Sequence, residues 1–216
     1  SEMCIRDRYI PYLIAVLLIG YFMILAVGNG YVYDETNVLS IVDRAVLGQA
    51  HIYGGAILDP EGLLSTISAV AHVMIGFCAG KLLMEVKDIH EKLERLFLIG
   101  TILTFAGFLL SYGSPICKKI WSPSFVLITC GMGSSFLALL VWIIDIKGYK
   151  GWSRFFESFG VNPLFIYVLA DILAILFAMI PMTYAGEPTS LHGYIYSALL
   201  QPVFGDKGGS LISVSY

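Results

Sequence analysis

The sequence predicts an all-α fold, a polytopic bundle of transmembrane helices with about five spans. Of its 216 residues, 57% are hydrophobic and 13% are charged, whereas about 25% of the residues of a typical soluble domain are charged. The mean hydropathy is +0.80. A soluble domain of this length cannot bury so much apolar surface in its own core. We therefore expect an integral membrane protein whose surface contacts the lipid bilayer.

The charge balance and the cysteines exclude several classes of protein. The net charge is −3 and the pI is near 5.7, so the chain lacks the basic stripe that binds a phosphate backbone, and nucleic acid is excluded as a partner. The four cysteines lie far apart, and none has the CxxC spacing of a metal site. No metal centre is predicted. The GxxxxGK, HExxH and GxSxG motifs of soluble enzymes are also missing from the sequence.

Five apolar segments are long enough to cross the hydrocarbon core, which takes roughly 20 residues of helix. They are Tyr9–Val27, a segment from Gly62 past Gly80, Leu96–Tyr112, Ser122–Ile144 and Asn162–Met182. A shorter apolar stretch at residues 191–200 is closed by Gln201-Pro202. Because it cannot span the bilayer, it is predicted to be a re-entrant or interfacial helix.

The distribution of cations predicts the orientation in the membrane. Loops 81–95 and 147–154 carry seven lysines and arginines, so both are expected on the cytoplasmic side, and the charges of loop 81–95 alternate at a spacing that extends the flanking helices into water. Segment 28–61 has five acids and one cation and is expected to be periplasmic, in a bacterial inner membrane. Lys118 and Lys119 lie on this outer side by parity, against the rule, and require a specific explanation.

The outer segment 28–61 is predicted to be a long ordered loop with a helix of its own. Connections longer than about 15 residues are usually functional or disordered. Here Thr36 and Asn37 can cap a helix, and apolar residues follow at helical spacing to Val46. The polar residues Ser40, Asp43 and Arg44 fall on the opposite face, which is typical of a helix at the membrane interface. Asp59-Pro60-Glu61 is expected to begin the second span as cap, first-turn proline and first-turn acid.

The outer segment also contains the candidate residues of a functional site. It places acids, a cation and an imidazole near one membrane face: Asp43, Arg44, His51, Asp59 and Glu61. Carboxylates accept protons from hydroxyl and ammonium groups, arginine fixes an anionic substituent, and histidine exchanges protons near neutral pH, as a sugar site requires. The same residues also fit solvated charges, two helix-capping acids and a loop histidine.

His72 and Asp171 are the ionisable residues deep inside predicted spans. A charge at that depth is costly and usually faces the bundle interior with a partner. The two residues are interpreted either as a hydrogen-bonded pair that lines a polar passage or as two separately satisfied groups. Two small-residue motifs, Gly76-x-x-x-Gly80 and Gly131-x-x-x-Ser135, are expected to serve packing within the chain rather than dimerisation, although a homo-oligomer stays open.

Both ends of the sequence are interpreted as cut. Residues 1–8 mix charges without periodicity and resemble a translated adapter remnant, so they are treated as an artefactual segment. Residues 209–216 begin a new apolar segment that is too short to span. We therefore expect residues 9–216 to be part of a transmembrane domain whose N-terminal part and last span are missing.

Four stretches together resemble the heparan-α-glucosaminide N-acetyltransferases and their bacterial homologues. These stretches are IVDRAVLGQAHIY (41–53), LDPEGLLST (58–66), PICKKIWSPSF (115–125), and the pair IDIKG (144–148) and GVNP (160–163). Order and spacing also agree, and the resemblance covers nearly everything after Tyr9. Cys117 stands where the family has asparagine.

The resemblance implies a membrane enzyme that takes acetyl from cytosolic acetyl-CoA and delivers it to the amino group of a glucosamine-type sugar on the far side. It offers as substrate-binding residues Asp43, Arg44, His51, Asp59, Glu61, Lys118, Trp121 and Asn162. It also explains Lys118 as a cation retained for a ligand or a carboxylate.

The family's catalytic histidine belongs to a His-x-x-Trp-x-Gly stretch, which none of the four histidines here matches. This C-terminal fragment is therefore expected to be inactive alone, with His51 as its candidate for auxiliary proton transfer. Two alternatives stay open. A proton-coupled secondary transporter would use Asp171 and His72 as a relay, although no internal repeat is found. A non-catalytic membrane scaffold would need none of the outer acids.

Overall fold

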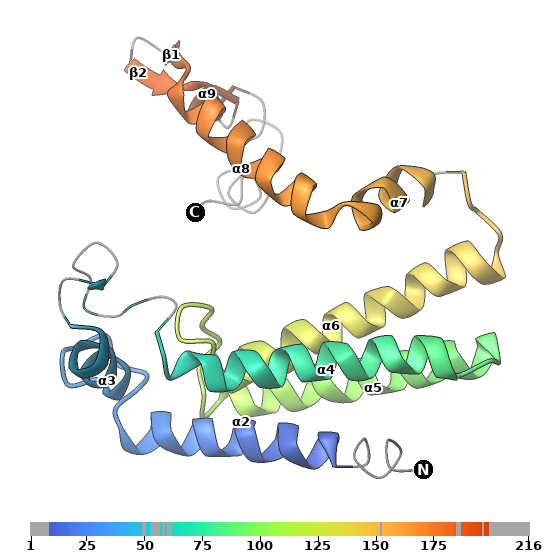
Figure 1. Ribbon diagram of the computed structural model, residues 1–216, viewed down its shortest axis with the longest axis horizontal. Coiled ribbons are helices and arrows are strands. Elements are labelled where there is room, and N and C mark those ends of the chain that lie inside the picture. The colour runs from blue at the N-terminus through green and yellow to red at the C-terminus, as the bar shows by residue number, and fades with distance from the viewer. Residues whose placement is uncertain are drawn as a thin grey trace. The chain divides into compact units, whose positions relative to one another are not determined.

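The computed structural model describes residues 9–48, 51, 52, 57, 59, 62–151, 153–184, 187–195, 197 and 198. The chain divides into two compact units, residues 1–149 and 150–216. The first is a set of long helices, and the second joins helices to a two-stranded hairpin (Figure 1). The predicted helical membrane class is confirmed. Residues 1–8 and 199–216 lie outside the described residues, so the interpretation of both ends stays a prediction.

Four segments of the first unit are long and apolar enough to cross a membrane. They are α2 (Ile10–Val27), α4 (Ser65–Glu85), α5 (Ile89–Ser111), and α6 (Pro123–Val141) continued by the π-helix η3 (Trp142–Ile146). Val16, Val73 and Phe105 are among the large apolar side chains that these helices leave exposed. Such surfaces suit contact with lipid. Four of the five predicted spans are thus confirmed by length and composition.

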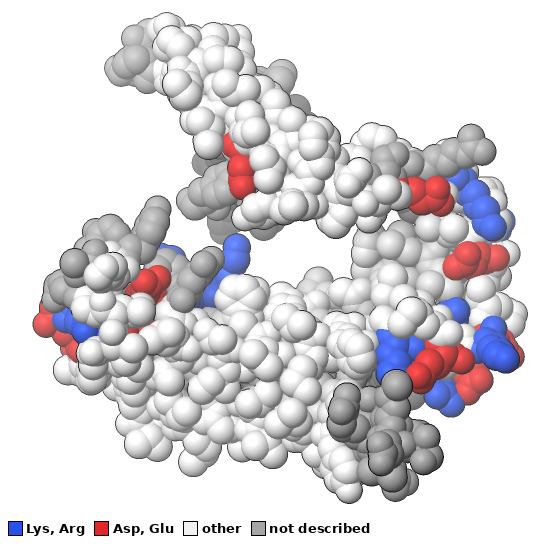
Figure 2. All heavy atoms as spheres, in the orientation of Figure 1, with Lys and Arg blue, Asp and Glu red and all other residues white. Residues whose placement is uncertain are grey.

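Charged side chains gather at the ends of the first unit. Figure 2 shows them around the α4–α5 turn and around α3 (Val38–Leu47), with uncharged helix surface between on this face. Asp88 caps α5 by accepting a hydrogen bond from the His90 N–H at 2.8 Å. Ion pairs join Lys81 to Glu85 at 3.5 Å and Arg95 to Glu91 at 2.5 Å. Helices α4 and α5 therefore extend into the charged loop, as predicted.

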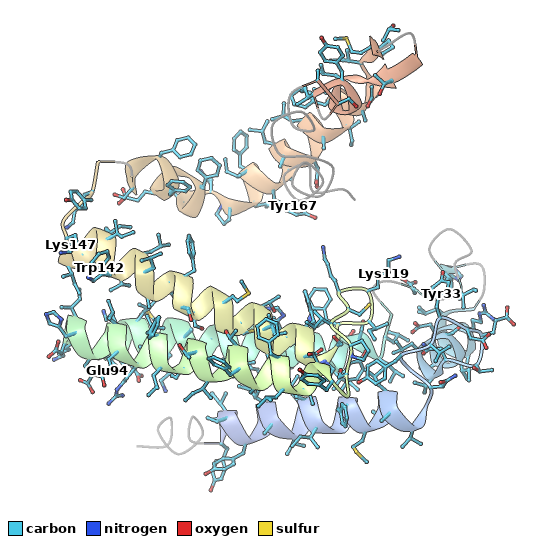
Figure 3. All side chains as sticks on the ribbon, turned by 180° about the vertical axis from the view of Figure 1, so that it is seen from behind. Tyr33, Glu94, Lys119, Trp142, Lys147 and Tyr167 are labelled. Carbon is cyan, nitrogen blue, oxygen red and sulfur yellow. The ribbon has the colours of Figure 1, made fainter. Side chains whose placement is uncertain are left out.

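The positive charge after α6 lies close to an aromatic ring. The Lys147 ammonium lies 5.1 Å from the centre of the Trp142 ring, and Figure 3 labels both residues. Tryptophan is enriched at membrane interfaces, where its ring can meet cations. The pair is consistent with α6 and η3 ending at the membrane surface.

Helices α5 and α6 approach closely through small residues. A Cβ built on Gly131 would lie 2.5 Å from the Thr104 nitrogen and 2.7 Å from the Gly100 oxygen, and one on Gly100 would lie 2.7 Å from the Ser135 nitrogen. The Gly131-x-x-x-Ser135 motif therefore serves packing within the chain, as predicted. Gly76 and Gly80 of α4 differ, because a Cβ added to either meets nothing within 4 Å in the described part of the chain.

The second unit contains α7 (Ser153–Val161), α8 (Pro163–Met179), β1 (Pro181–Tyr184), β2 (Glu187–Ser190) and α9 (Leu191–Ile195). Helices α7 and α8 are bent by 101° and supply a fifth span only if the pair crosses as one. Proline is the first helical residue of α8, as expected after Asn162. Of the short helix predicted at 191–200, α9 forms the first half.

The antiparallel hairpin of β1 and β2 is a short exception within the confirmed all-α class. Pro181 pairs with Ser190 and Tyr184 with Glu187. The fifth span was predicted to reach Met182, but α8 ends at Met179 and Ile180 is extended. Proline at 181 cannot continue a helix and is tolerated as the first residue of a strand. A hydropathy profile does not detect this change from helix to strand.

We expect Gly131→Ala to destabilise the chain, because the new methyl group meets two backbone atoms of α5 as well as the Thr104 hydroxyl. The loss should be about 1–3 kcal/mol, as for other overpacked contacts. Thermal unfolding of the purified chain in detergent, followed by intrinsic fluorescence, measures it. Gly133→Ala on the same helix is the matched control, since a Cβ there meets nothing within 4 Å. Equal melting temperatures for the two variants would refute the close α5–α6 contact.

Candidate functional site

Asn37 holds the outer segment in an ordered conformation. It is fully buried. Its Nδ2 donates hydrogen bonds to the Gly30 oxygen at 3.0 Å and the Val32 oxygen at 2.8 Å, and its Oδ1 accepts one from the Leu39 N–H at 2.9 Å. The amide therefore closes the loop after α2 and caps α3, as the sequence predicted for this position.

Helix α3 packs on the end of the helix bundle in the first unit. Leu39 joins a buried cluster with Tyr21 and Leu25 of α2 and with Ile120. The Tyr21 hydroxyl donates a hydrogen bond to the Ile120 oxygen at 2.5 Å. The outer segment thus lies against this end of the bundle (Figure 1). A site made by its side chains and by the 115–122 connection is geometrically possible.

The predicted helix α3 is present, and its polar face is buried against the protein. Ser40 and Asp43 are 1% and 0% exposed, whereas the apolar Ile41 and Val46 are 53% and 66% exposed. Leu39 is buried as expected. The inward face thus combines the apolar contact of Leu39 with the hydrogen bond that Asp43 accepts.

Asp43 completes the start of α4. Its Oδ1 accepts a hydrogen bond from the Leu63 N–H at 2.9 Å, and its Oδ2 fills the space that a Cβ on Gly62 would need. Helix α4 begins at Ser65 without a side-chain cap of its own. The prediction that Asp59-Pro60-Glu61 begins this helix was therefore wrong. A carboxylate does stabilise this N-terminal turn, but it comes from α3.

The environment of the Asp43 carboxylate disfavours its charged form. Burial raises its pKa, the hydrogen bond from Leu63 opposes that rise, and the nearby Asp59 adds to it. Its Oδ2 is buried and has no hydrogen-bond partner among the described residues. Buried polar atoms are nearly always paired in native proteins. An unpaired acceptor here suits an N–H or O–H group supplied by a ligand.

Three other residues of the outer segment were predicted to belong to the same site: Arg44, His51 and Glu61. Arg44 lies 3.5 Å from the Glu35 carboxylate, and its Nε is buried without a hydrogen-bond partner in the described part of the chain. His51 is exposed, and its Nδ1 donates to the Leu47 oxygen at 2.8 Å, which holds the ring at the end of α3. Glu61 lies outside the described residues.

The 115–122 connection contains two lysines: Lys118, which was predicted to belong to the site, and Lys119, which was not. Both lysines are exposed. Lys119 lines a hollow of about 110 Å³ with Tyr31, Tyr33, Pro115 and Cys117 among its walls. Figure 3 labels Lys119 and Tyr33 at the end of the first unit that carries α3. Sequence reasoning missed Lys119 because only Lys118 matches the family's motif.

A serine network fixes the turn that follows Lys119. The Ser122 Oγ accepts hydrogen bonds from the Cys117 N–H at 3.0 Å and the Phe125 N–H at 3.3 Å, and lies 3.1 Å from the Ser124 Oγ. Ser122 is thereby the N-cap of α6. Trp121, just before it, has a φ of +52°, which is unusual for a bulky residue. The backbone conformation of this turn determines the direction of the Trp121 indole ring.

Trp121 and His72 lie together, although the sequence analysis assigned them to different places. Their ring centres are 5.9 Å apart, and the Phe125 ring lies 5.7 Å from Trp121 and 6.4 Å from His72. Trp121 Nε1 and His72 Nδ1 are both buried without hydrogen-bond partners among the described residues. The same holds for the hydroxyl of fully buried Ser68, one turn earlier on α4. Unpaired polar groups thus recur along α4.

His72 also lines a groove of about 350 Å³ between α4 and α6. Gly76 and Gly80 of α4 and Thr129 and Ser134 of α6 contribute to its walls. The open faces of Gly76 and Gly80 are therefore part of this groove. Among the described residues, no group of three His, Cys, Asp or Glu side chains could hold a metal ion.

Asn162 and Asp171 belong to the second unit. Asn162 is exposed and precedes α8 without a side-chain cap hydrogen bond, and Asp171 lies partly buried in the middle of α8. The two units are separate bodies. The pairing of His72 with Asp171 and the placement of Asn162 in the pocket therefore stay predictions.

Comparison with known proteins gives two relatives and no matching family model. Heparan-alpha-glucosaminide N-acetyltransferase of Mus musculus is 30% identical over 154 residues, which are 61% of this chain and 23% of the mouse protein. The enzyme of the same name from Homo sapiens is 32% identical over 149 residues, 59% of this chain and 22% of the human protein. The match is shorter than the motifs suggested, and the chain spans less than a quarter of these relatives. The chain is a distant relative of the heparan-alpha-glucosaminide N-acetyltransferases.

Proposed function

We propose that the intact protein is a membrane acetyltransferase that acetylates the amino group of a glucosamine-type sugar. Acetyl-CoA on the cytoplasmic side is the donor, and the outer segment faces the periplasm of a bacterial inner membrane. Two observations support this. The curated relatives are N-acetyltransferases, and a buried carboxylate oxygen of Asp43 has no partner among the described residues. The unpaired Asp43 oxygen is the observation that supports a substrate-binding site in the outer segment.

The reaction requires a neutral amine. The amine nitrogen forms a bond to the acetyl carbon, a base takes one proton from nitrogen, the thioester C–S bond breaks, and CoA leaves as a thiolate that takes up that proton. Asp43 Oδ2 accepts a hydrogen bond from the sugar's amino or hydroxyl group and orients it. The principal base is the histidine of the family's His-x-x-Trp-x-Gly stretch, which these 216 residues do not contain.

The oxyanion of the tetrahedral intermediate needs a hydrogen-bond donor. Trp121 Nε1–H is buried and unpaired among the described residues, so it supplies a donor to the bound sugar or to this oxyanion. The remaining proposed contacts to the sugar come from the outer segment and from two other positions: Arg44, His51, Asp59, Glu61, Lys118 and Asn162. His51 assists proton transfer in this proposal.

A transport assay coupled to product analysis tests the proposal against its two alternatives. The intact protein is placed in proteoliposomes with acetyl-CoA on one side and glucosamine on the other. Formation of N-acetylglucosamine supports the proposal. A glucosamine gradient without acetylation would instead indicate a transporter that uses His72 and Asp171, and the absence of both would indicate a scaffold.

Asp43→Asn is expected to lower kcat/KM for the amino sugar at least 100-fold in the intact protein. The amide keeps the acceptor for Leu63 but replaces the unpaired oxygen by a donor, and the loss is in the range for a buried charged contact to substrate. Initial rates with acetyl-CoA and glucosamine measure it. Asp34→Asn, an exposed acid of the same segment, is the control. Unchanged kcat/KM in Asp43→Asn would remove this carboxylate from the site.

The same variant is expected to gain stability. Because the folded state raises the pKa of Asp43, native stability falls as the pH rises from the unfolded-state pKa of about 4 through the folded-state pKa. Asparagine does not titrate. The melting temperature of Asp43→Asn should therefore exceed that of the native chain at pH 7, and the difference should shrink towards pH 4. A difference that grows on acidification would contradict the assigned shift.

His51→Ala is expected to lower kcat with little change in KM, because the ring is exposed and is held by the Leu47 oxygen at the end of α3. Steady-state kinetics of the intact protein provide the test, with His90→Ala, an exposed residue in the first turn of α5, as control. Full activity in both His51→Ala and Asp59→Ala would exclude these two side chains from the mechanism.

A further inference from the structure

His72 and Trp121 bring two buried ring nitrogens to the same part of the first unit. The ring centres are 5.9 Å apart, and the Phe125 ring lies within 6.4 Å of both. His72 Nδ1 and Trp121 Nε1 are buried, and neither has a hydrogen-bond partner in the part of the chain that the structure describes. Because buried polar atoms are nearly always paired in native proteins, we expect a bound molecule to pair with them.

The chemistry of the two nitrogens selects an oxygen acceptor. The indole N–H of Trp121 is a donor only, and a neutral imidazole with its proton on Nδ1 also donates at that atom. The two rings come from different segments, His72 from α4 and Trp121 from the turn before α6. Two donors on separate segments can approach one oxygen from different sides. A carbonyl oxygen has two lone pairs and can accept both hydrogen bonds.

The groove between α4 and α6 leads to His72. Its volume of about 350 Å³ lies within the range of roughly 300–1,000 Å³ for ligand pockets. The groove is lined from His72 to Gly80, which corresponds to about 12 Å of helix. A Cβ added to Gly76, Gly80 or Gly133 meets nothing within 4 Å among the described residues. The groove therefore suits an extended chain whose carbonyl end lies at His72.

The direction of the groove agrees with the side from which the acyl donor comes. From His72 the groove follows α4 towards the α4–α5 turn, which the proposed function places on the side of acetyl-CoA. Ser68 lies one turn before His72 and is fully buried. It continues the polar face of α4 towards Leu63, where Asp43 binds. The acyl donor and the sugar thus approach His72 from opposite ends of α4.

We propose that His72 is a further catalytic residue, which together with Trp121 donates hydrogen bonds to the carbonyl oxygen of the acyl thioester. The thioester arm lies in the groove between α4 and α6. This inference rests on the proposed function, and it assigns a role to a histidine that lies outside the predicted substrate-binding residues.

The step stabilised by these donors is the attack of the amine nitrogen on the thioester carbonyl carbon. The π electron pair of the carbonyl bond moves to oxygen, and the two N–H groups stabilise the resulting oxyanion. Reformation of the C=O bond expels CoA as a thiolate. The proton that leaves nitrogen passes through the base to that thiolate, so His72 neither gains nor loses a proton.

Two substitutions of His72 in the intact protein test this role. His72→Phe keeps a ring against Trp121 and Phe125 but removes the donor. It is expected to lower kcat about 100-fold, the usual cost of one oxyanion donor, with little change in the KM for glucosamine. His72→Asn should have a kcat roughly tenfold above that of His72→Phe, because its amide retains a donor near the position of Nδ1.

Binding of a second ligand gives a measurement that does not depend on turnover. S-ethyl-CoA has a thioether in place of the thioester and lacks the carbonyl oxygen. By titration calorimetry, the native protein should bind acetyl-CoA about tenfold more tightly than S-ethyl-CoA, and this preference should fall to about threefold or less in His72→Phe. An unchanged preference in His72→Phe would overturn the proposal.

The groove is tested by filling it. Gly76→Leu should raise the KM for acetyl-CoA severalfold, because the larger side chain occupies the space of the groove. Gly20→Leu on α2 is the matched control, since a Cβ there also meets nothing within 4 Å in the described part of the chain. An equal KM in the two variants would exclude the thioester arm from this groove.

The outcomes separate this inference from the proposed function. Full kcat in His72→Phe, with an active native protein, would overturn the role of His72 and leave the acetyltransferase proposal standing. A native protein that forms no N-acetylglucosamine would instead contradict the proposed function. In that case the preference for acetyl-CoA over S-ethyl-CoA still decides whether His72 binds a carbonyl oxygen.

Discussion

The burial of the Asp43 carboxylate against the start of α4 is the interaction on which the arrangement of the outer segment depends. It joins two residues 20 positions apart in sequence and requires the polar face of α3 to point inwards. Transferring a carboxylate from water is unfavourable, and one hydrogen bond from Leu63 offsets only part of that cost. A neutral acceptor at position 43, such as an amide oxygen, would make the same hydrogen bond at a lower desolvation cost. The presence of an acid with an unpaired oxygen is therefore better explained by ligand binding than by folding.

The sequence predicts those features whose causes are local or depend only on hydrophobic length. The four long helices of the first unit follow from apolar runs of the right length, since the bilayer imposes that length on any spanning helix. Asn37 is identifiable as a cap because its acceptor serves a backbone N–H two residues away. The resemblance to the acetyltransferases likewise depends on short motifs that are read along the chain.

The features that escaped prediction depend on contacts between distant segments. The face of α3 that is buried depends on Leu63, and the first residue of α4 depends on Asp43, so neither can be read from the helix itself. The approach of Trp121 to His72 depends on a left-handed backbone at Trp121. A bulky residue rarely adopts that conformation, and composition gives no sign of it.

Helices α5 and α6 pack closely against each other, whereas α4 keeps an open face. This difference distinguishes the scaffold from the proposed site. Gly100 and Gly107 of α5 and Gly131 of α6 are covered by backbone of the facing helix, so this pair cannot shift without losing close contacts. The α4 face that holds Ser68 and His72 instead keeps polar atoms with no hydrogen-bond partner in the described part of the chain, and Gly76 continues it into an open groove. Because the rigid α6 also carries Ser122, which fixes the turn at Trp121, the indole is held in place while the α4 side can accommodate a ligand. Pre-organised groups opposite an open, polar face are what a binding site requires. In the proposed function, the α5–α6 pair positions the site, and the α4 face with its unpaired polar atoms forms part of it.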